Sequence, residues 1–241
     1  NGVGASRTYR LSSDEELTFF LDTKDDTLYI MEEMVHGYVR TYDAIIDSNG
    51  EPIFESGNVT CDSLMDVVNE AKDSIFYIVK ELPEVMKQLG RRTVKAFGVK
   101  SRFVHFEYFV LKADQEGLGK KGDIFGLEVN MRPPGGYAPE LANFANSVDV
   151  YKIWADMIAY DSTLVPMNGQ HYFCGFCGRR DGKNYKMSHD DIMREYGHKM
   201  KLAGRTPDAL SGAMANQMYV ANYDTEEEMM EAFRRMCEVW E

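Results

Sequence analysis

Residues 127–136, LEVNMRPPGG, are the most informative stretch of the sequence. Glu128, Asn130 and Arg132 stand at alternate positions, with apolar residues between them. Side chains at alternate positions of a β-strand share one face, so this pattern predicts a strand with one polar and one apolar face. Asparagine is depleted inside strands, which favours a functional reason for Asn130. The run of residues 133–136, Pro-Pro-Gly-Gly, ends the strand abruptly.

A second predicted strand, HFEYF at residues 105–109, carries Glu107. The Gly- and Lys-rich connection at residues 115–122 allows it to pair with the first strand, which would bring Glu107 to the same polar face. Two carboxylates and an amide oxygen are hard ligands that suit Mg²⁺ or Mn²⁺, and the fork of Arg132 suits phosphoryl oxygens. The alternative is a solvated strand face of alternating charge. His105 is two residues before Glu107 and shares its face, either to contact substrate or, as we expect, as a satisfied core histidine.

Two further stretches call for a chemical explanation. The opening residues 1–8, NGVGASRT, form a Gly-spaced loop of the kind whose backbone N–H groups can approach a phosphate. Residues 31–37, MEEMVHG, end an apolar run with two glutamates and a glycine. A Gly-spaced loop alone is weak evidence for phosphate binding. It becomes informative because it precedes the other stretches in the chain.

Together these stretches resemble the ATP-grasp ligases. LEVNMRPPGG is similar to that family's E-x-N-x-R-P-x-G-G signature, and HFEYF resembles the strand with its first metal-binding glutamate. Residues 30–37, IMEEMVHG, resemble the E-E-x-V-x-G hinge that holds adenine, and residues 1–8 resemble the phosphate loop. The resemblance covers residues 1–160 and is greatest to carbamoyl-phosphate-synthase-like proteins and carboxylate–amine ligases.

The resemblance implies an α+β (α/β) chain with the ATP-grasp fold, with largely antiparallel sheets and flanking helices. It divides the chain into a remnant of the small lid subdomain (1–33), a large subdomain with the metal and nucleotide site (34–160) and an α+β extension (161–241). The family's phosphate loop follows a lysine, so the chain is expected to be a fragment that lacks this lysine and an N-terminal domain.

The resemblance also implies roles for single residues. Metal would be bound by Glu107, Glu128 and Asn130, and the transferred phosphoryl group or the acyl phosphate would contact Arg132. The adenine edge would meet the backbone of Glu33, Met34 and Val35. The phosphates would be covered by Gly2, Val3, Gly4 and Ala5.

The implied reaction is ATP- and Mg²⁺-dependent (or Mn²⁺-dependent). A carboxylate, carbamate or bicarbonate becomes an acyl phosphate, which an amine then attacks. Many relatives bind the ribose with a carboxylate two residues after the hinge glycine. Val39 stands there instead, which leaves the ribose to Asp43 or another residue. The alternatives are a nucleotide-binding module without turnover and a redox or zinc protein that uses Cys174 and Cys177. The identity of the substrates and the oligomeric state are not readable from the sequence.

The composition disfavours several classes of protein. The formal net charge of −12 over 241 residues disfavours a protein that coats nucleic acid. No stretch approaches the roughly 18 consecutive apolar residues of a membrane span. Four scattered cysteines suit a reducing cytoplasm better than a disulfide scaffold. The C-x-x-C pair at Cys174 and Cys177 lies in a predicted strand, which favours ordinary buried thiols.

Local patterns predict the remaining elements. We expect a short strand at residues 8–11, a helix capped by Ser12 or Ser13, and a hairpin over residues 38–57 that turns at Asn49-Gly50. A helical period over residues 62–90 predicts a long helix that Pro83 kinks or restarts. Further predictions are helix over residues 137–161, a strand at 171–178, and helices capped by Ser188 and Thr225.

Overall fold

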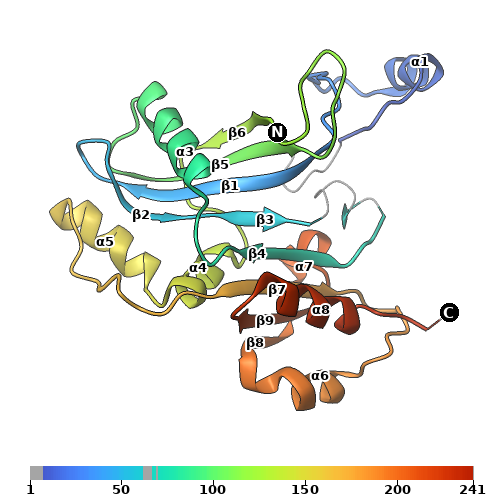
Figure 1. Cartoon of the computed structure of the whole chain (residues 1–241). Helices are drawn as coiled ribbons and strands as arrows, with labels where there is room; N and C mark the ends of the chain where they lie inside the picture. Colours follow the sequence, from blue (N-terminus) through green and yellow to red (C-terminus); the bar gives the residue numbers. More distant parts are fainter. Residues whose placement is uncertain (1–7, 62–66, 69, 241) are drawn as a thin grey trace.

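A computed structural model of the chain describes residues 8–61, 67–68 and 70–240. These residues form one sheet of nine strands in the order β6-β5-β1-β3-β4-β7-β9-β8, with β2 beside β1 (Figure 1). All described strand pairs are antiparallel, which confirms the expected class. The strands are β1 (Gly37–Ile46), β2 (Pro52–Ser56), β3 (Asn58–Thr60), β4 (Ser74–Ile78), β5 (Arg102–Leu111), β6 (Ile124–Asn130), β7 (Phe173–Arg179), β8 (Met200–Arg205) and β9 (Gln217–Tyr223).

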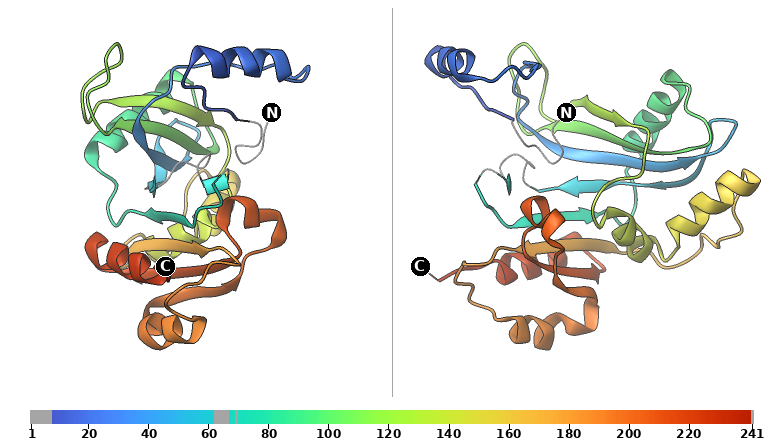
Figure 2. Two further views of the ribbon diagram at one scale, coloured as in Figure 1. Left: turned by 90° about the vertical axis from the view of Figure 1, so that its right-hand side faces the viewer. Right: turned by 180° about the vertical axis from the view of Figure 1, so that it is seen from behind.

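Helices cover both faces of the sheet (Figures 1 and 2). One face, which we call the α3 face, packs against α3 (Glu84–Ala96), α6 (His189–Tyr196) and α8 (Glu226–Met236). The opposite face, which we call the α4 face, packs against α4 (Ala138–Asn146), α5 (Val150–Tyr160) and α7 (Asp208–Met214). Because the sheet is covered on both sides, a central strand such as β4 packs apolar side chains in both directions.

The hairpin of β1 and β2 forms as the sequence predicts. Gly50 adopts φ +89°, a left-handed conformation that glycine adopts without steric cost. The Asp47 carboxylate accepts hydrogen bonds of 2.8 Å from the N–H groups of Asn49 and Glu51. These bonds close the turn and set the register of the two strands.

Helix α3 approaches the sheet closely at one glycine. A Cβ atom at Gly90 would overlap the ring of Tyr42, which is fully buried on the α3 face. Met86 and Val94, one turn away on either side, bury their side chains in the same cluster. The absence of a side chain at Gly90 therefore permits this close contact between helix and sheet.

Two predictions from local pattern are wrong. Residues 74–78 lie in the expected helix over 62–90 but form strand β4, and the helix begins only after Pro83. A strand buried on both faces shows no polar alternation, so its apolar run matches a helical period equally well. Residues 8–11, expected as a strand, have no regular structure. Ala71, inside the expected helix, has a positive φ of 49°.

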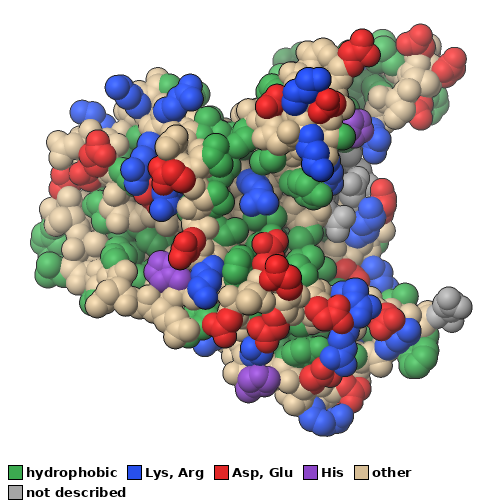
Figure 3. Space-filling model, viewed as in Figure 1, with side chains coloured by type: hydrophobic (Ala, Val, Ile, Leu, Met, Phe, Trp, Pro, Cys, Tyr) green, Lys and Arg blue, Asp and Glu red, His purple; other side chains and the backbone are tan. Residues whose placement is uncertain are grey.

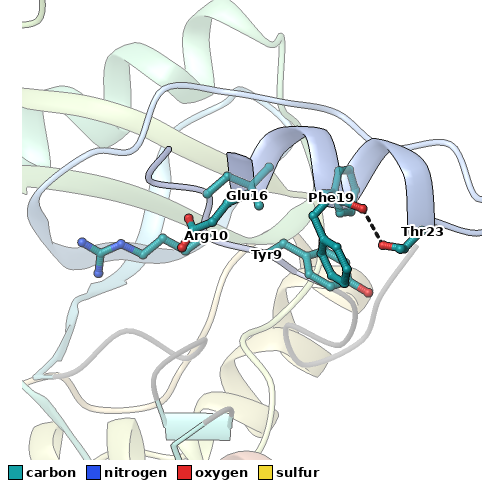
Figure 4. Close-up of a pocket in the computed structure, with 7 residues that line it drawn as sticks. Tyr9, Arg10, Glu16, Phe19 and Thr23 are labelled. Carbon is teal, nitrogen blue, oxygen red and sulfur yellow. Dashed lines mark hydrogen bonds between the residues drawn. The ribbon is translucent and has the colours of Figure 1, made fainter. Parts of the chain in front are cut away.

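The N-terminal segment extends away from the sheet. Helix α1 (Asp14–Thr23) is capped by Ser13, as expected, but it buries no side chain fully. A shallow pocket lies between this helix and the preceding segment, lined by Tyr9, Arg10, Leu11, Glu16, Phe19, Phe20 and Thr23 (Figure 4). Acidic and apolar side chains gather over this arm at the upper right of the molecule (Figure 3).

The C-terminal segment continues the same sheet, because β7 pairs with β4 over five residues. Ser188 caps α6 in a capping box with Asp191, and Thr225 caps α8, which confirms both predictions. Strand β8 and helix α7 were not predicted. None of the helices in the described part of the chain has the length and apolar character needed to cross a lipid bilayer.

Candidate functional site

Two carboxylates face each other at the edge of the sheet. Glu107 on β5 and Glu128 on β6 are directly opposite residues in the antiparallel register. Such partners place their Cβ atoms about 4.5–5.5 Å apart on the same face. Because odd-numbered residues of β1 and β5 point to the α4 face, both glutamates lie on that side. Glu128 is exposed, and the Glu107 side chain is 24% exposed.

Asn130 and Arg132 extend this edge toward the loop that follows β6. Asn130 is opposite His105, one row along from the two glutamates and on the same face. Its Nδ2 atom is buried without a partner in the described structure. Arg132 is exposed, and its Nη1 donates to the carbonyl of Pro133 at 2.9 Å. The structure therefore brings Glu107, Glu128 and Asn130 to one face, and it places Arg132 two residues beyond Asn130.

A hydrogen-bonded line of side chains runs from β1 to Glu107. The Asp43 carboxylate accepts from the Thr41 hydroxyl at 2.6 Å and from Nδ1 of His105 at 2.6 Å. Nε2 of His105 lies 3.0 Å from Oε1 of Glu107. Asp43 is 3% exposed and has both oxygens occupied, so it is not free to contact a ribose. His105 is buried and fully paired, as expected of a core histidine, but its second partner is a predicted metal ligand.

The electrostatics of this line favour a charged imidazole. Burial by itself lowers the pKa of His105, but the charge of Asp43 and the hydrogen bonds to Asp43 and Glu107 outweigh burial and raise the pKa to about 10. Both ring nitrogens then act as donors toward carboxylates. The imidazolium therefore offsets part of the negative charge gathered at this edge of the sheet.

The predicted adenine-binding segment has no regular secondary structure and is held by one side chain. The Gln115 side chain accepts from the backbone N–H of His36 at 3.1 Å and donates to the Met34 carbonyl at 2.9 Å. Its amide nitrogen also donates to the Glu33 carboxylate at 3.0 Å. The His36 carbonyl accepts from the N–H of Lys112. The connection between β5 and β6 therefore fixes the path of residues 33–36.

This arrangement leaves the opposite edge of the segment open. The backbone groups that bind the Gln115 side chain are the N–H of His36 and the carbonyl of Met34, so the N–H of Val35 and the carbonyl of Glu33 are not used in this contact. Neither of these two groups has a hydrogen-bond partner within residues 8–61, 67–68 and 70–240. One backbone donor and one backbone acceptor are the groups that pairing with the edge of an adenine ring requires. Gly2, Val3, Gly4 and Ala5, predicted to cover the phosphates, lie outside the described residues.

The donor set fits a hard cation that keeps most of its water. Glu107, Glu128 and Asn130 offer oxygen ligands, and Mg²⁺ is usually held by one or two carboxylates together with waters and phosphate oxygens. No cluster of three or more His, Cys, Asp or Glu side chains with metal-binding geometry occurs in the part of the chain that the structure describes. The buried, unpartnered amide nitrogen of Asn130 is consistent with a site that receives a further oxygen-bearing group.

The C-x-x-C pair does not form a second site. Cys174 packs on the α4 face of β7 and Cys177 on the α3 face, so their side chains point apart. Cys177 instead lies 3.4 Å from the thiol of Cys237 at the end of α8. Burial raises the pKa of the Cys174 thiol, which keeps it protonated. None of the four cysteines forms a disulfide.

Sequence reasoning missed Gln115 and the connection between Asp43 and His105. Gln115 lies in a loop that was interpreted only as a connection, and no motif marks it. Asp43 and His105 are 62 residues apart and meet only because β1 and β5 pair. The i, i+2 spacing of His105 and Glu107 was the one readable signal.

The structure is similar to solved structures of several enzymes. Phosphoribosylglycinamide synthetase from Anaerococcus prevotii matches 93% of this chain and 58% of its own, with a TM-score of 0.57 and 13% identity. N5-carboxyaminoimidazole synthetase from Staphylococcus aureus, complexed with ADP, matches 97% and 59%, with a TM-score of 0.60 and 7% identity. L-amino acid ligase from Bacillus licheniformis matches 83% and 50%, with a TM-score of 0.57 and 12% identity. No family model and no curated protein matches the sequence.

At these identities the similarity establishes the fold. The chain has the ATP-grasp fold that its motifs implied, and it spans between 50% and 59% of the length of these three proteins. The roles of single residues and the division at residues 33 and 160 stay predictions.

Proposed function

We propose that this chain is the nucleotide- and metal-binding part of an ATP-dependent ligase. Such an enzyme activates a carboxylate, carbamate or bicarbonate as an acyl phosphate, which an amine then converts to a C–N bond. The solved structures with the same fold are ligases and synthetases, one of them complexed with ADP, and this supports the proposal.

One observation carries the proposal. The opposed pair of Glu107 and Glu128, with Asn130 beside it, lies on β5 and β6, and β5 pairs with β1, the strand into which residues 33–36 lead. Val35 is six residues from Thr41, the partner of Glu107 on β1. Six extended residues span at most ~20 Å, which is comparable with a stretched ATP molecule. Adenine at residues 33–35 and terminal phosphates at Glu107 and Glu128 therefore fit the distance between these two places.

The proposed ligase reaction has two steps. A carboxylate oxygen attacks the γ-phosphorus and ADP leaves, and the amine nitrogen then attacks the acyl carbon, loses a proton and displaces phosphate. In such phosphoryl transfer, positioning and neutralisation of charge are the protein's main contributions. When bound, Mg²⁺ or Mn²⁺ would offset the negative charge of the phosphate oxygens.

This chain's own residues would bind and orient the reactants. The Val35 N–H and the Glu33 carbonyl would bind the adenine edge, while Met34 is held by Gln115. Glu107, Glu128 and Asn130 would hold the metal. The exposed guanidinium of Arg132 would donate to the oxygens of the transferred phosphoryl group.

A thermal-shift series tests the binding part of the proposal. The chain is mixed with Mg-ATP, Mg-ADP, ZnCl₂ or ATP with EDTA. We expect stabilisation only by the Mg-nucleotides, because a ligand that binds the folded state raises its stability by mass action. Glu107→Gln should lose this shift, whereas Glu116→Gln, an exposed control in the nearby loop, should keep it. An equal shift in EDTA, or a shift with zinc alone, would contradict the proposal.

A second assay separates a ligase from a binding module. Release of ADP and phosphate is measured on a panel of small carboxylates with and without amines, using the longest natural form of the protein. A ligase releases phosphate only when both substrates are present. Nucleotide binding without release on any pair would favour the module.

A further inference from the structure

Polar side chains form two adjacent rows on the α4 face. Asp43, His105 and Asn130 are opposite one another on β1, β5 and β6, and Glu107 and Glu128 form the next row. A row of this kind is unusual inside a sheet that is covered on both sides. It calls for a reason beyond packing.

The hydrogen bonds within the two rows end at the carboxylate of Glu107. Asp43 and His105 are more than nine-tenths buried, and among the described residues their hydrogen-bonded line reaches the surface through the carboxylate of Glu107. Oε1 of Glu107 is occupied by Nε2 of His105. Oε2 has no such partner in the described structure and remains available to a ligand.

A contribution to folding stability alone does not explain the buried pair of Asp43 and His105. A buried ion pair loses hydration on folding, and replacing it by apolar residues of similar volume is often neutral or stabilising. Carboxylates that bind metal are in turn oriented by hydrogen bonds from residues behind them, and the loss of those residues weakens metal binding. The line from Asp43 through His105 to Glu107 has this form.

We propose that Asp43 and His105 are positioning residues that hold the Glu107 carboxylate in its metal-binding orientation. This inference rests on the proposed function. Asp43 fixes the imidazole ring through Nδ1, and the ring fixes Glu107 through Nε2. Preorganising the carboxylate removes an entropic cost from metal binding.

Two substitutions at His105 separate positioning from simple packing. A glutamine side chain carries its amide nitrogen near the place of Nε2, and an asparagine side chain carries it near the place of Nδ1. His105→Gln therefore keeps a donor for Glu107, whereas His105→Asn keeps a donor for Asp43 only. Both variants remove the ring and its charge, so a purely structural role predicts similar losses in both.

The measurement is Mn²⁺ binding to the chain, read from the electron paramagnetic resonance signal of free Mn²⁺, with and without ADP. We expect His105→Gln to bind within about threefold of wild type and His105→Asn to bind about 10–100-fold more weakly. Circular dichroism and thermal melting check that both variants fold. His189→Asn is a matched control, because His189 contacts Tyr219 on the α3 face.

The outcomes are distinguishable. Equal affinities of the two His105 variants, or tighter binding by His105→Asn, would overturn the positioning role while wild-type binding keeps the proposed function. A wild-type chain that binds no Mn²⁺, or a Glu107→Gln variant that binds as tightly as wild type, would overturn both. If His105→Asn does not fold, Asp43→Asn takes its place, with weaker Mn²⁺ binding expected and wild-type affinity overturning the role.

Discussion

Glu107 and Glu128 are directly opposite residues of β5 and β6, and both side chains lie on the α4 face. Like charges in such a pair repel each other, which destabilises a sheet. This arrangement is unfavourable for folding unless a cation lies between the carboxylates. The same two glutamates would therefore lower the stability of the metal-free chain slightly and bind the metal.

Glu128→Gln tests this connection directly. We expect Mg-ATP affinity to fall about tenfold or more, because one ligand of the metal loses its charge. Without metal, the same variant should be slightly more stable than wild type, by a few tenths of a kcal/mol, since the repulsion is removed. Calorimetry measures the first effect and urea unfolding the second. Unchanged Mg-ATP affinity would contradict the assignment of Glu128.

Gln115→Ala tests the adenine-binding segment. The substitution removes three hydrogen bonds to residues 33–36 without touching the groups that would bind the ring. We expect nucleotide affinity to fall about tenfold, since the segment must be ordered again at each binding event. Gln88→Ala on α3, where the side chain donates to the Glu84 carboxylate, is the control. Equal affinity of the two variants would show that Gln115 does not support the nucleotide site.

Gly90→Ala tests the packing of α3 on the sheet. Alanine favours a helix by about 1 kcal/mol over glycine, but the new Cβ would overlap the Tyr42 ring. We expect a net loss of about 1–3 kcal/mol, as in other overpacked cores. Gly212→Ala in α7 has open space and should be neutral or stabilising. Urea unfolding compares the two, and a stabilised Gly90→Ala would refute the close contact.

The Asp47 turn leads to a pH-dependent prediction. Partial burial by itself raises the pKa of Asp47, but hydrogen bonds from the N–H groups of residues 49–51 outweigh it and leave the pKa below its usual value. The unfolded state then binds the proton more readily, so the stability from Asp47 is present above about pH 4 and is lost as the pH falls further.

Asp47→Ala should therefore be less stable than wild type at pH 7, by about 1 kcal/mol. The difference should shrink as the pH falls from 4 to 3, because the unfolded state takes up the proton before the folded state does. Thermal unfolding from pH 3 to pH 7 measures this trend. A gap that stays constant across that range would show that the charge of the Asp47 carboxylate does not stabilise the turn.

The sequence predicted the edge of the sheet better than its centre. On β6 the alternation of Glu128 and Asn130 with apolar residues is visible, because one face meets solvent or ligand. On β4, Ile75 and Tyr77 point to the α3 face and Phe76 and Ile78 to the α4 face, so nothing alternates. The helical prediction there failed for this reason.

The candidate site shows the same limit. Its predicted metal ligands stand in two short motifs and were named by residue, whereas the side chains that hold them come from distant parts of the chain. The contact of Asp43 with His105 depends on the register of β1 and β5, which no local pattern contains. Sequence reasoning therefore reached the residues that would touch the ligand and missed those behind them.

The pairing of β4 with β7 has a consequence for shortened forms of the protein. A polypeptide that stopped at residue 160 would leave the backbone donors and acceptors of β4 bare along that side. Such an exposed edge invites pairing with another chain. Truncation there should therefore yield self-associating, poorly soluble material rather than a smaller working unit.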